Sequence, residues 1–308
     1  MMSFRTNLYI SLLLLLCSSS VTISLPHNNS TPNPYLTQTT LFLQNYQKMV
    51  QNFKVFMYEP NITQFKFGTQ TQVESLFYSS LRNSSYITQH PEEANLFFLP
   101  FASDISTRSL ARVVSRIRND FPYWNRTLGA DHFYLSCTGI LMKNDRNLVE
   151  LKKNAVQISC FPTRQDRFVP HKDLTLPPLR NSHAPVKLGS GEFCVVDCGN
   201  DDVLSLGEAL RLGCVPVVVT EGPLNDMPFV DVLRWRKMAV FVKSYVKDDT
   251  DTWRERHEFM KRLGVVASKH LQWNRSPIPF DAFNTIMYQL WLRRHTVRYE
   301  RESPIMST

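Results

Sequence analysis

The stretch from Gly207 to Thr220, G-E-A-L-R-L-G-C-V-P-V-V-V-T, predicts a short amphipathic helix, a turn and a buried strand. Gly213 suits the end of the helix, because glycine accepts the left-handed backbone conformation found there. The apolar run from Val215 to Val219 is typical of a parallel strand that is buried on both faces. A helix that leads into such a strand is half of a β-α-β unit, and open α/β sheets bind ligands beyond the carboxyl ends of their strands.

The same alternation of strand and helix continues on both sides of this stretch. Strands are predicted at 54–59, 95–100, 131–136, 155–160, 192–196 and 238–242, and helices at 73–81, 109–121, 252–263 and 280–294. Repeated strand-helix order favours an α/β protein with parallel, doubly wound sheets.

Two positions near the 207–220 stretch could bind a nucleotide. Glu208 lies close to the start of the predicted helix, where its carboxylate could accept hydrogen bonds from a ribose diol. An acid is also common there because the helix dipole favours it. Gly199 and Asn200 precede this helix, and glycine allows backbone amides to come close to a phosphate. These residues are the candidate donor-binding residues.

Five motifs occur in one order along the chain. They are E-E-A-N-L-F-F-L-P-F (92–101), P-Y-W-N-R-T-L-G-A-D-H-F (122–133), F-C-V-V-D-C-G (193–199), E-A-L-R-L-G-C-V-P-V-V-V (208–219) and D-A-F-N (281–284). Together they resemble the exostosin family, glycosyltransferase family 47, in its plant cell-wall branch, from about Lys54 to Arg294. The resemblance implies two Rossmann-type domains of the GT-B type, a UDP-sugar donor, a polysaccharide acceptor and inverting transfer in the Golgi lumen. It implies no cofactor and no metal, and other glycosyltransferases as possible partners.

The resemblance and the composition divide the chain into four parts. Residues 1–25 form a targeting segment, and 26–52, rich in Asn, Thr, Pro and Gln, are expected to be a stem. An acceptor-side domain would span 53–180 and a nucleotide-sugar domain 181–308.

Inverting transfer needs a general base on the acceptor hydroxyl. Asp131 and His132, in G-A-D-H-F, are the best polar pair of the first domain, with a role in acceptor binding or as the base. A structural hydrogen-bonded pair at the start of a strand is the alternative.

The chain departs from the family pattern in three places. Thr138–Leu141 stand where the family has His-Asp-Trp-Gly, and Ser205-Leu206-Gly207 replace a Ser-x-Arg element, which leaves Ser205 as a donor-site candidate. Only fifteen residues separate Pro178 from Phe193, although the family has a strand, a helix and another strand there and a β-α-β crossover takes about 30 residues. The second domain is therefore expected to be incomplete. A non-catalytic partner within a glycosyltransferase complex is the alternative function.

The N-terminus reads as a secretory targeting segment. Arg5 precedes an apolar run from Leu8 to Cys17, and counting on to Leu25 gives a stretch that could just cross a thin membrane. The alternatives are a type II signal anchor in the Golgi membrane and a cleaved signal peptide on a secreted protein.

Sequons and cysteines agree with a lumenal protein. N-x-S/T sequons occur at Asn28, Asn29, Asn61, Asn83, Asn125 and Asn274, of which Asn125 is expected to be buried. Five cysteines outside the targeting segment would face an oxidising lumen: Cys137, Cys160, Cys194, Cys198 and Cys214. Cys137 with Cys160 is the preferred disulfide, because both end predicted strands. Cys194 and Cys198 could pair if their strand bends.

Bulk composition excludes several other classes. The 308 residues are 43% hydrophobic and 20% charged, as in a globular protein, and the formal net charge is +8. A basic surface could attract UDP-sugars, acidic polysaccharide or anionic membrane. Nucleic-acid binding has little support, because zinc-finger spacing and alternating basic and aromatic residues are missing.

Overall fold

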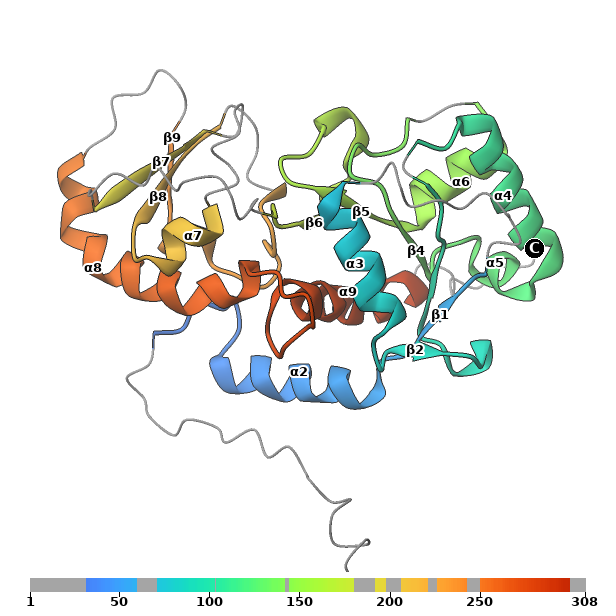
Figure 1. The fold of residues 1–308 in the computed structure, drawn as a ribbon, viewed down its shortest axis with the longest axis horizontal. Helices are drawn as coiled ribbons and strands as arrows, with labels where there is room; N and C mark the ends of the chain where they lie inside the picture. Colours follow the sequence, from blue (N-terminus) through green and yellow to red (C-terminus); the bar gives the residue numbers. More distant parts are fainter. Residues whose placement is uncertain are drawn as a thin grey trace, which may run out of the picture. The chain divides into compact units, whose positions relative to one another are not determined.

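The larger sheet is parallel throughout and follows the predicted alternation of strand and helix (Figure 1). The computed structural model describes residues 32–59, 71–102, 104–141, 144–179, 192–197, 206–220, 226–242 and 250–299, and only the backbone of 165, 197, 250–255 and 295–299. The strand order in this sheet is β2-β1-β3-β4-β5-β6. The strands are β1 (Val55–Met57), β2 (Ile87–Thr88), β3 (Leu96–Phe98), β4 (His132–Leu135), β5 (Val156–Cys160) and β6 (Leu174–Leu176).

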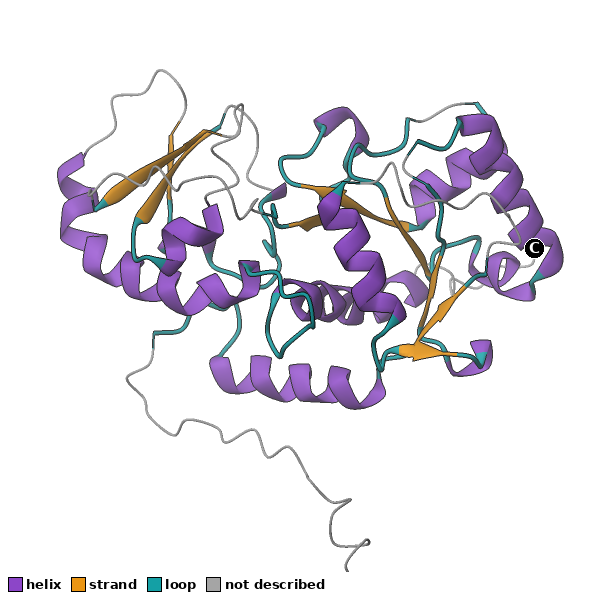
Figure 2. Ribbon diagram, viewed as in Figure 1, coloured by secondary structure: helices purple, strands orange, loops and turns teal. Residues whose placement is uncertain are grey.

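Helices connect these strands and cover the sheet (Figure 2). They are α3 (Gln72–Arg82), α4 (Thr107–Asp120), α5 (Pro122–Thr127) and α6 (Arg146–Asn154), with 3-10 turns at Pro91–Glu93 and Gln165–Arg167. Polar side chains fix the starts of three of these helices, because they accept hydrogen bonds from backbone amides that have no partner within the helix. Thr71 and Glu74 form a capping box on α3, Ser106 caps α4 and Asp145 caps α6.

Both faces of the sheet are buried. Alternate residues of a strand point to opposite faces, and β3 shows this directly, since Leu96 and Phe98 belong to one apolar cluster and Phe97 to another. This explains why its sequence is apolar throughout rather than alternating.

Helix α9 (Ala282–Tyr299) packs against the first sheet although it ends the described chain. Phe283 meets Phe77 of α3 with ring centroids 5.8 Å apart, and the Tyr86 hydroxyl donates a hydrogen bond of 2.9 Å to Asn284. This helix therefore packs with the first sheet, although the expected boundary assigns all of 181–308 to the second domain.

The segment expected to be a stem contains a helix with buried side chains. Residues 39–52 of the 26–52 segment form helix α2 (Thr39–Asn52), whose Phe42, Tyr46 and Met49 are buried. The apolar residues at positions 42, 46 and 49 form one stripe, which packs against α9. The residues around this stripe are mostly polar, so the composition of the segment does not indicate a helix of the core.

A second parallel sheet contains the stretch that opens the sequence analysis. Within the described residues its order is β7 (Phe193–Asp197), β8 (Val215–Val219) and β9 (Val240–Val242). Its helices are α7 (Leu206–Arg211) and α8 (Thr250–Ala267), with 3-10 turns at Trp235–Lys237 and Ser268–Leu271. An α/β fold with two Rossmann-type parallel sheets, as in GT-B proteins, is confirmed.

The turn after α7 has the predicted conformation. Gly213 has a φ of +79°, and the Cys214 amide donates to the Ala209 carbonyl at 2.9 Å. This pattern ends a helix with a left-handed glycine. A Cβ on Gly213 would also lie 2.9 Å from Cε of Lys261 on α8.

Two disulfides stabilise the sheets. Cys137 is joined to Cys160, the pair preferred from the sequence, with Cα atoms 4.4 Å apart. Cys194 is joined to Cys214 across 5.9 Å between Cα atoms, not to Cys198. The pairing of β7 with β8 places Cys194 opposite Pro216. Cys214 lies two positions before Pro216, so its sulfur is within reach of the Cys194 sulfur.

Helices of the described part include none long and apolar enough to cross a membrane. The targeting segment 1–25 lies outside the described residues.

Candidate functional site

The first sheet changes winding direction between β1 and β3. The chain leaves β1 towards β2 on one side and returns to β3 on the other, and open α/β sheets bind ligands beyond the carboxyl ends of strands at such a point. Glu59 lies exposed two residues after the end of β1. Glu59 ends the predicted strand K-V-F-M-Y-E, just before Pro60, and this place at the end of a strand is the sequence signal for it.

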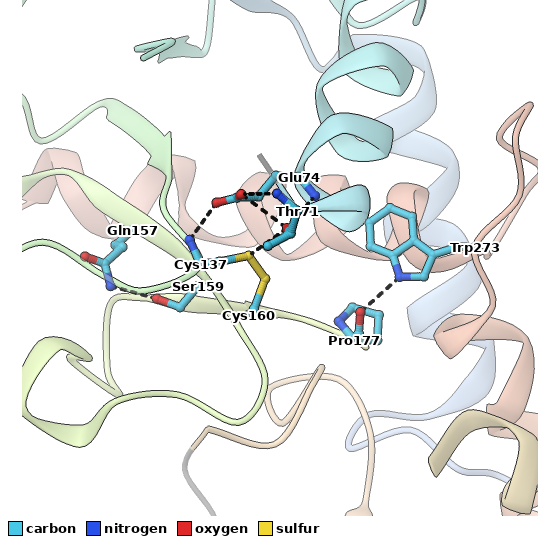
Figure 3. Close-up of a disulfide and its surroundings, with 8 residues drawn as sticks. All are labelled: Thr71, Glu74, Cys137, Gln157, Ser159, Cys160, Pro177 and Trp273. Carbon is cyan, nitrogen blue, oxygen red and sulfur yellow. Dashed lines mark hydrogen bonds between the residues drawn. A yellow bond between two sulfur atoms is a disulfide. The ribbon is translucent and has the colours of Figure 1, made fainter. Parts of the chain in front are cut away.

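The carboxyl ends of β4 and β5 lie along the same edge of the sheet and are braced by the Cys137–Cys160 disulfide (Figure 3). Glu74 of α3 is buried beside it and accepts a hydrogen bond of 2.9 Å from the Cys137 amide. Its other oxygen accepts bonds from the amide and hydroxyl of Thr71, at 3.0 and 3.2 Å. Glu74 therefore ties the disulfide-linked part of the edge to the start of α3.

The turn after Cys137 is held by side chains of other segments that bond to its backbone. Gly139 has a φ of +67°, and Arg167 donates to the Thr138 carbonyl at 3.3 Å. The Ile140 amide donates to the side chain of Gln157, which in turn donates to Ser159 at 2.7 Å. A packed turn thus stands where the resemblance leads one to expect a His-Asp pair.

Asp131 and His132 are brought together, but away from this edge. His132 is the first residue of β4, at the amino end of the strand, and both side chains are buried. Nδ1 of His132 lies 2.8 Å from Asp131, and Nε2 lies 2.8 Å from the Tyr58 hydroxyl. The imidazole ring lies nearly parallel to the rings of Tyr58 and Phe97, with centroids 5.6 and 5.1 Å away. Burial at the amino end of β4 favours the structural alternative over the expected catalytic role.

Electrostatics fit that structural role. Burial lowers the pKa of His132, so the neutral ring donates its Nδ1 proton to Asp131 and accepts from Tyr58. Burial alone would raise the pKa of Asp131, but hydrogen bonds from His132, Thr127 and Arg126 outweigh it and lower the pKa to about 2. Asp131 is thus an ionised carboxylate that accepts hydrogen bonds from three side chains, which does not suit a general base.

The second sheet presents Glu208 near the amino end of α7. Leu206, Ala209 and Leu210 are buried, which leaves the Glu208 side chain 22% exposed. It forms an ion pair with Arg211 at 2.6 Å. The other donor-site candidates, Gly199, Asn200 and Ser205, lie outside the described residues.

The sequons differ in their accessibility. Asn83 and Asn125 are exposed, so the expectation that Asn125 is buried is wrong; it lies on the outer side of α5 while the neighbouring Trp124 fills the core. Asn274 is half-buried, and its Nδ2 donates to Asp281 at 3.2 Å. Asn28, Asn29 and Asn61 lie outside the described residues.

Substitution of the exposed sequons should remove glycans one at a time. In a plant secretory host, we expect Asn83→Gln and Asn125→Gln each to increase gel mobility by one glycan, because both side chains are exposed, although the Asn125 amide nitrogen donates to the Arg118 carbonyl at 3.1 Å. Asn274→Gln should leave mobility unchanged, because Asn274 is half-buried and its amide nitrogen donates to the Asp281 carboxylate. Enzymatic deglycosylation should bring all variants to one mobility, and a shift caused by Asn274→Gln would contradict the expectation.

Comparison with known families gives a match in two pieces. The model of the exostosin GT47 domain matches residues 49–189 and again 180–246. The pieces meet at 180–189, within the interval where the sequence analysis finds the family pattern shortened. A family model thus covers more than half of the chain but is broken at the predicted place.

Plant proteins are similar along most of the chain. The Probable glycosyltransferase At5g03795 of Arabidopsis thaliana is 25% identical over 350 positions, covering 86% of this chain and 66% of its own length. Probable glucuronosyltransferase 47 A of Physcomitrium patens is 28% identical over 70% of this chain and 68% of its own. Probable beta-1,4-xylosyltransferase IRX10L of Arabidopsis thaliana is 21% identical over 62% of this chain and 65% of its own.

The first of these alignments is longer than the chain itself, at 350 positions against 308 residues. The relative therefore carries residues that this chain lacks within the matched region. Fold, ordered motifs and family match agree, and the chain belongs to the exostosin GT47 family.

Proposed function

We propose that the protein is a Golgi glycosyltransferase that moves a sugar, with inversion, from a UDP-sugar to a cell-wall polysaccharide such as pectin or hemicellulose. The observation that carries the proposal is Glu208, a partly exposed carboxylate on the helix that joins two parallel strands of the second sheet. Such a position suits a ribose diol, and the family match supports a nucleotide-sugar donor.

The reaction places separate demands on the two sheets. An acceptor hydroxyl oxygen attacks the anomeric carbon, the bond from that carbon to the UDP oxygen breaks, and UDP leaves with the electron pair. A carboxylate takes the hydroxyl proton. Glu59 is a candidate for this base, because it is exposed at the switch point of the first sheet, whereas Asp131 is buried at the opposite edge.

Binding of UDP tests the donor site. Glu208→Ala should weaken UDP binding at least about tenfold, since the loss of hydrogen bonds to a charged group costs about 1.5–3 kcal/mol. Glu258→Ala removes the same charge from an exposed position of α8 and should leave the affinity unchanged. Calorimetric titration of the full chain with UDP makes the comparison. If both variants and the unmodified protein bind UDP with equal affinity, the assignment of Glu208 to the donor site is refuted.

A second candidate function is a non-catalytic partner in a glycosyltransferase complex. The broken family match at 180–189 and the residues missing relative to the Arabidopsis protein favour it. Sugar transfer by the purified chain, lost in Glu59→Gln, would rule it out. UDP binding without transfer would favour it.

Residence in the Golgi membrane, with residues 8–25 as anchor and the folded part in the lumen, belongs to the same proposal. Two disulfides and exposed sequons support an oxidising lumen. Secretion is the alternative, and loss of residues 8–25 from the mature protein would favour it.

A further inference from the structure

A hollow of about 400 Å³ lies between α4 and α6, outside the residues assigned above (Figure 1 shows the two helices). This volume is within the range of ligand pockets. Its lining comes from the amino-terminal half of α4 and from the cap and first turn of α6: Thr107, Arg108, Ala111, Arg112, Ser115, Asp145, Asn147 and Leu148. Cations, hydroxyls, an amide and two small apolar surfaces therefore meet in one place.

Two arginines line the hollow without a partner among the residues that the structure describes. Arg108 and Arg112 are exposed and lie one helical turn apart, so they are on one face of α4. Neither forms an ion pair or donates a hydrogen bond within the described part. Arg118 and Arg146 differ, because both bind Glu150. The carboxylate of α6 is thus used elsewhere, and the two arginines share the hollow with a single carboxylate, that of Asp145.

The remaining lining favours a sugar acid over a simple anion. Asp145 faces the hollow, although its Oδ1 already accepts from the amides of Asn147 and Leu148 at 2.9 and 3.2 Å. This carboxylate can still accept a hydrogen bond from a sugar hydroxyl, a donor that a ring sugar carries beside its acid group. Ser115 and Asn147 add further polar groups, while Ala111 and Leu148 suit the C–H face of a sugar ring.

The position of the hollow connects it to the sheet edge that holds the proposed acceptor site. A helix that follows a parallel strand starts near the carboxyl end of that strand, and α4 follows β3 while α6 follows β4. The first turns of both helices, and the hollow between them, therefore lie at the edge that carries Glu59 and the Cys137–Cys160 disulfide. A polymer held in the hollow would run along the edge where its end must react.

We propose that this hollow binds a uronate residue of an acidic acceptor polysaccharide, with Arg108 and Arg112 holding the carboxylate. The proposal rests on the proposed glycosyltransferase function and names its acceptor class. The planar guanidinium group of arginine matches a carboxylate with two parallel hydrogen bonds.

The test is a titration of the full chain with a defined oligogalacturonate, in the absence of any donor. Arg108→Ala and Arg112→Ala should each weaken binding about tenfold or more, since one hydrogen bond to a charged group is worth about 1.5–3 kcal/mol. Arg116→Ala is the matched control, because Arg116 is exposed on the same helix but does not line the hollow. The fully methyl-esterified oligomer, which keeps the sugar and loses the charge, should bind at least tenfold more weakly.

Three outcomes would overturn the proposal: equal binding of the esterified oligomer, an equal loss in Arg116→Ala, or competition by inorganic phosphate at the same concentration as the oligomer. Failure of the proposed function is recognised separately, by the absence of UDP binding. Oligogalacturonate binding without UDP binding would leave the hollow valid and the donor assignment refuted.

Discussion

Phe42→Ala is expected to lower the free energy of unfolding by about 3–5 kcal/mol, the usual cost of deleting a buried aromatic ring. The ring is 1% exposed and stacks on Tyr35 with centroids 3.9 Å apart. It also meets His270 and Tyr288 edge-on, at 5.9 and 5.1 Å. Side chains from three parts of the chain thus pack around one ring, two of them more than two hundred residues away, and none can shift far to fill the cavity.

The neighbouring residue provides the control. Leu41 lies on the opposite side of the same helix and is 46% exposed, so Leu41→Ala should cost less than about 1 kcal/mol. Urea denaturation, followed by circular dichroism and tryptophan fluorescence, compares both variants with the unmodified protein. Similar midpoints for the two variants would mean that α2 is not docked in solution.

Asp131→Asn is expected to cost about 3 kcal/mol at neutral pH, because it breaks a buried ionic hydrogen-bond network. Asp131 accepts from Thr127 at 2.5 Å, from His132 at 2.8 Å and from Arg126 at 2.9 Å. An amide can satisfy these donors only in part, and one of its own donors would then oppose the histidine or the threonine.

The contribution of Asp131 to the free energy of unfolding depends on pH. The pKa of Asp131 is lowered from 3.8 to about 2 in the folded state, so the unfolded chain takes up the proton first as pH falls. The stabilisation, about 2 kcal/mol, is full above about pH 4 and is lost as pH falls towards 2. The difference between Asp131→Asn and the unmodified protein should therefore narrow below pH 4.

Denaturation curves between pH 7 and pH 3 measure that difference. Asp120→Asn, at an exposed position at the end of α4, is the control and should change stability little at any pH. A constant difference between Asp131→Asn and the unmodified protein down to pH 3 would show that Asp131 is not held ionised by its neighbours.

Local pattern in the sequence was enough to predict the elements that form the two sheets. The apolar run of β8, the glycine after α7 and the helical spacing of α3 and α4 lie within short windows, where periodicity and backbone conformation act. The disulfide between Cys137 and Cys160 could also be predicted from the sequence, because adjacent parallel strands bring their ends together.

The errors concern contacts between distant segments. Nothing near Thr39–Asn52 reveals that its apolar stripe is covered by α9, nor does Cys194 reveal that a turn twenty residues later supplies its partner. The choice between catalysis and structure for His132 also depended on burial, which arises from Tyr58, Phe97 and Trp124 together.

The motifs that identify the family mostly hold the fold together. Asn95 accepts a bond from the Lys54 amide at 2.8 Å, and Asp281 accepts bonds from the amides of Ile278 and Asn284 at the start of α9. Trp124 is wholly buried. Such residues are retained for packing, so they identify the family without revealing the sugar or the acceptor.

The hydrogen bond of 3.1 Å between Tyr35 and His270 joins residues 235 positions apart, and α9 lies further along still. During biosynthesis the apolar side of α2 and one face of the first sheet therefore stay exposed until nearly the whole chain has been translated. Contacts of such long range slow folding and leave the nascent chain prone to aggregation. Production of this protein should therefore depend strongly on the chaperones of the compartment into which it is translated, and premature termination before α9 should yield a chain that is degraded rather than a smaller stable domain.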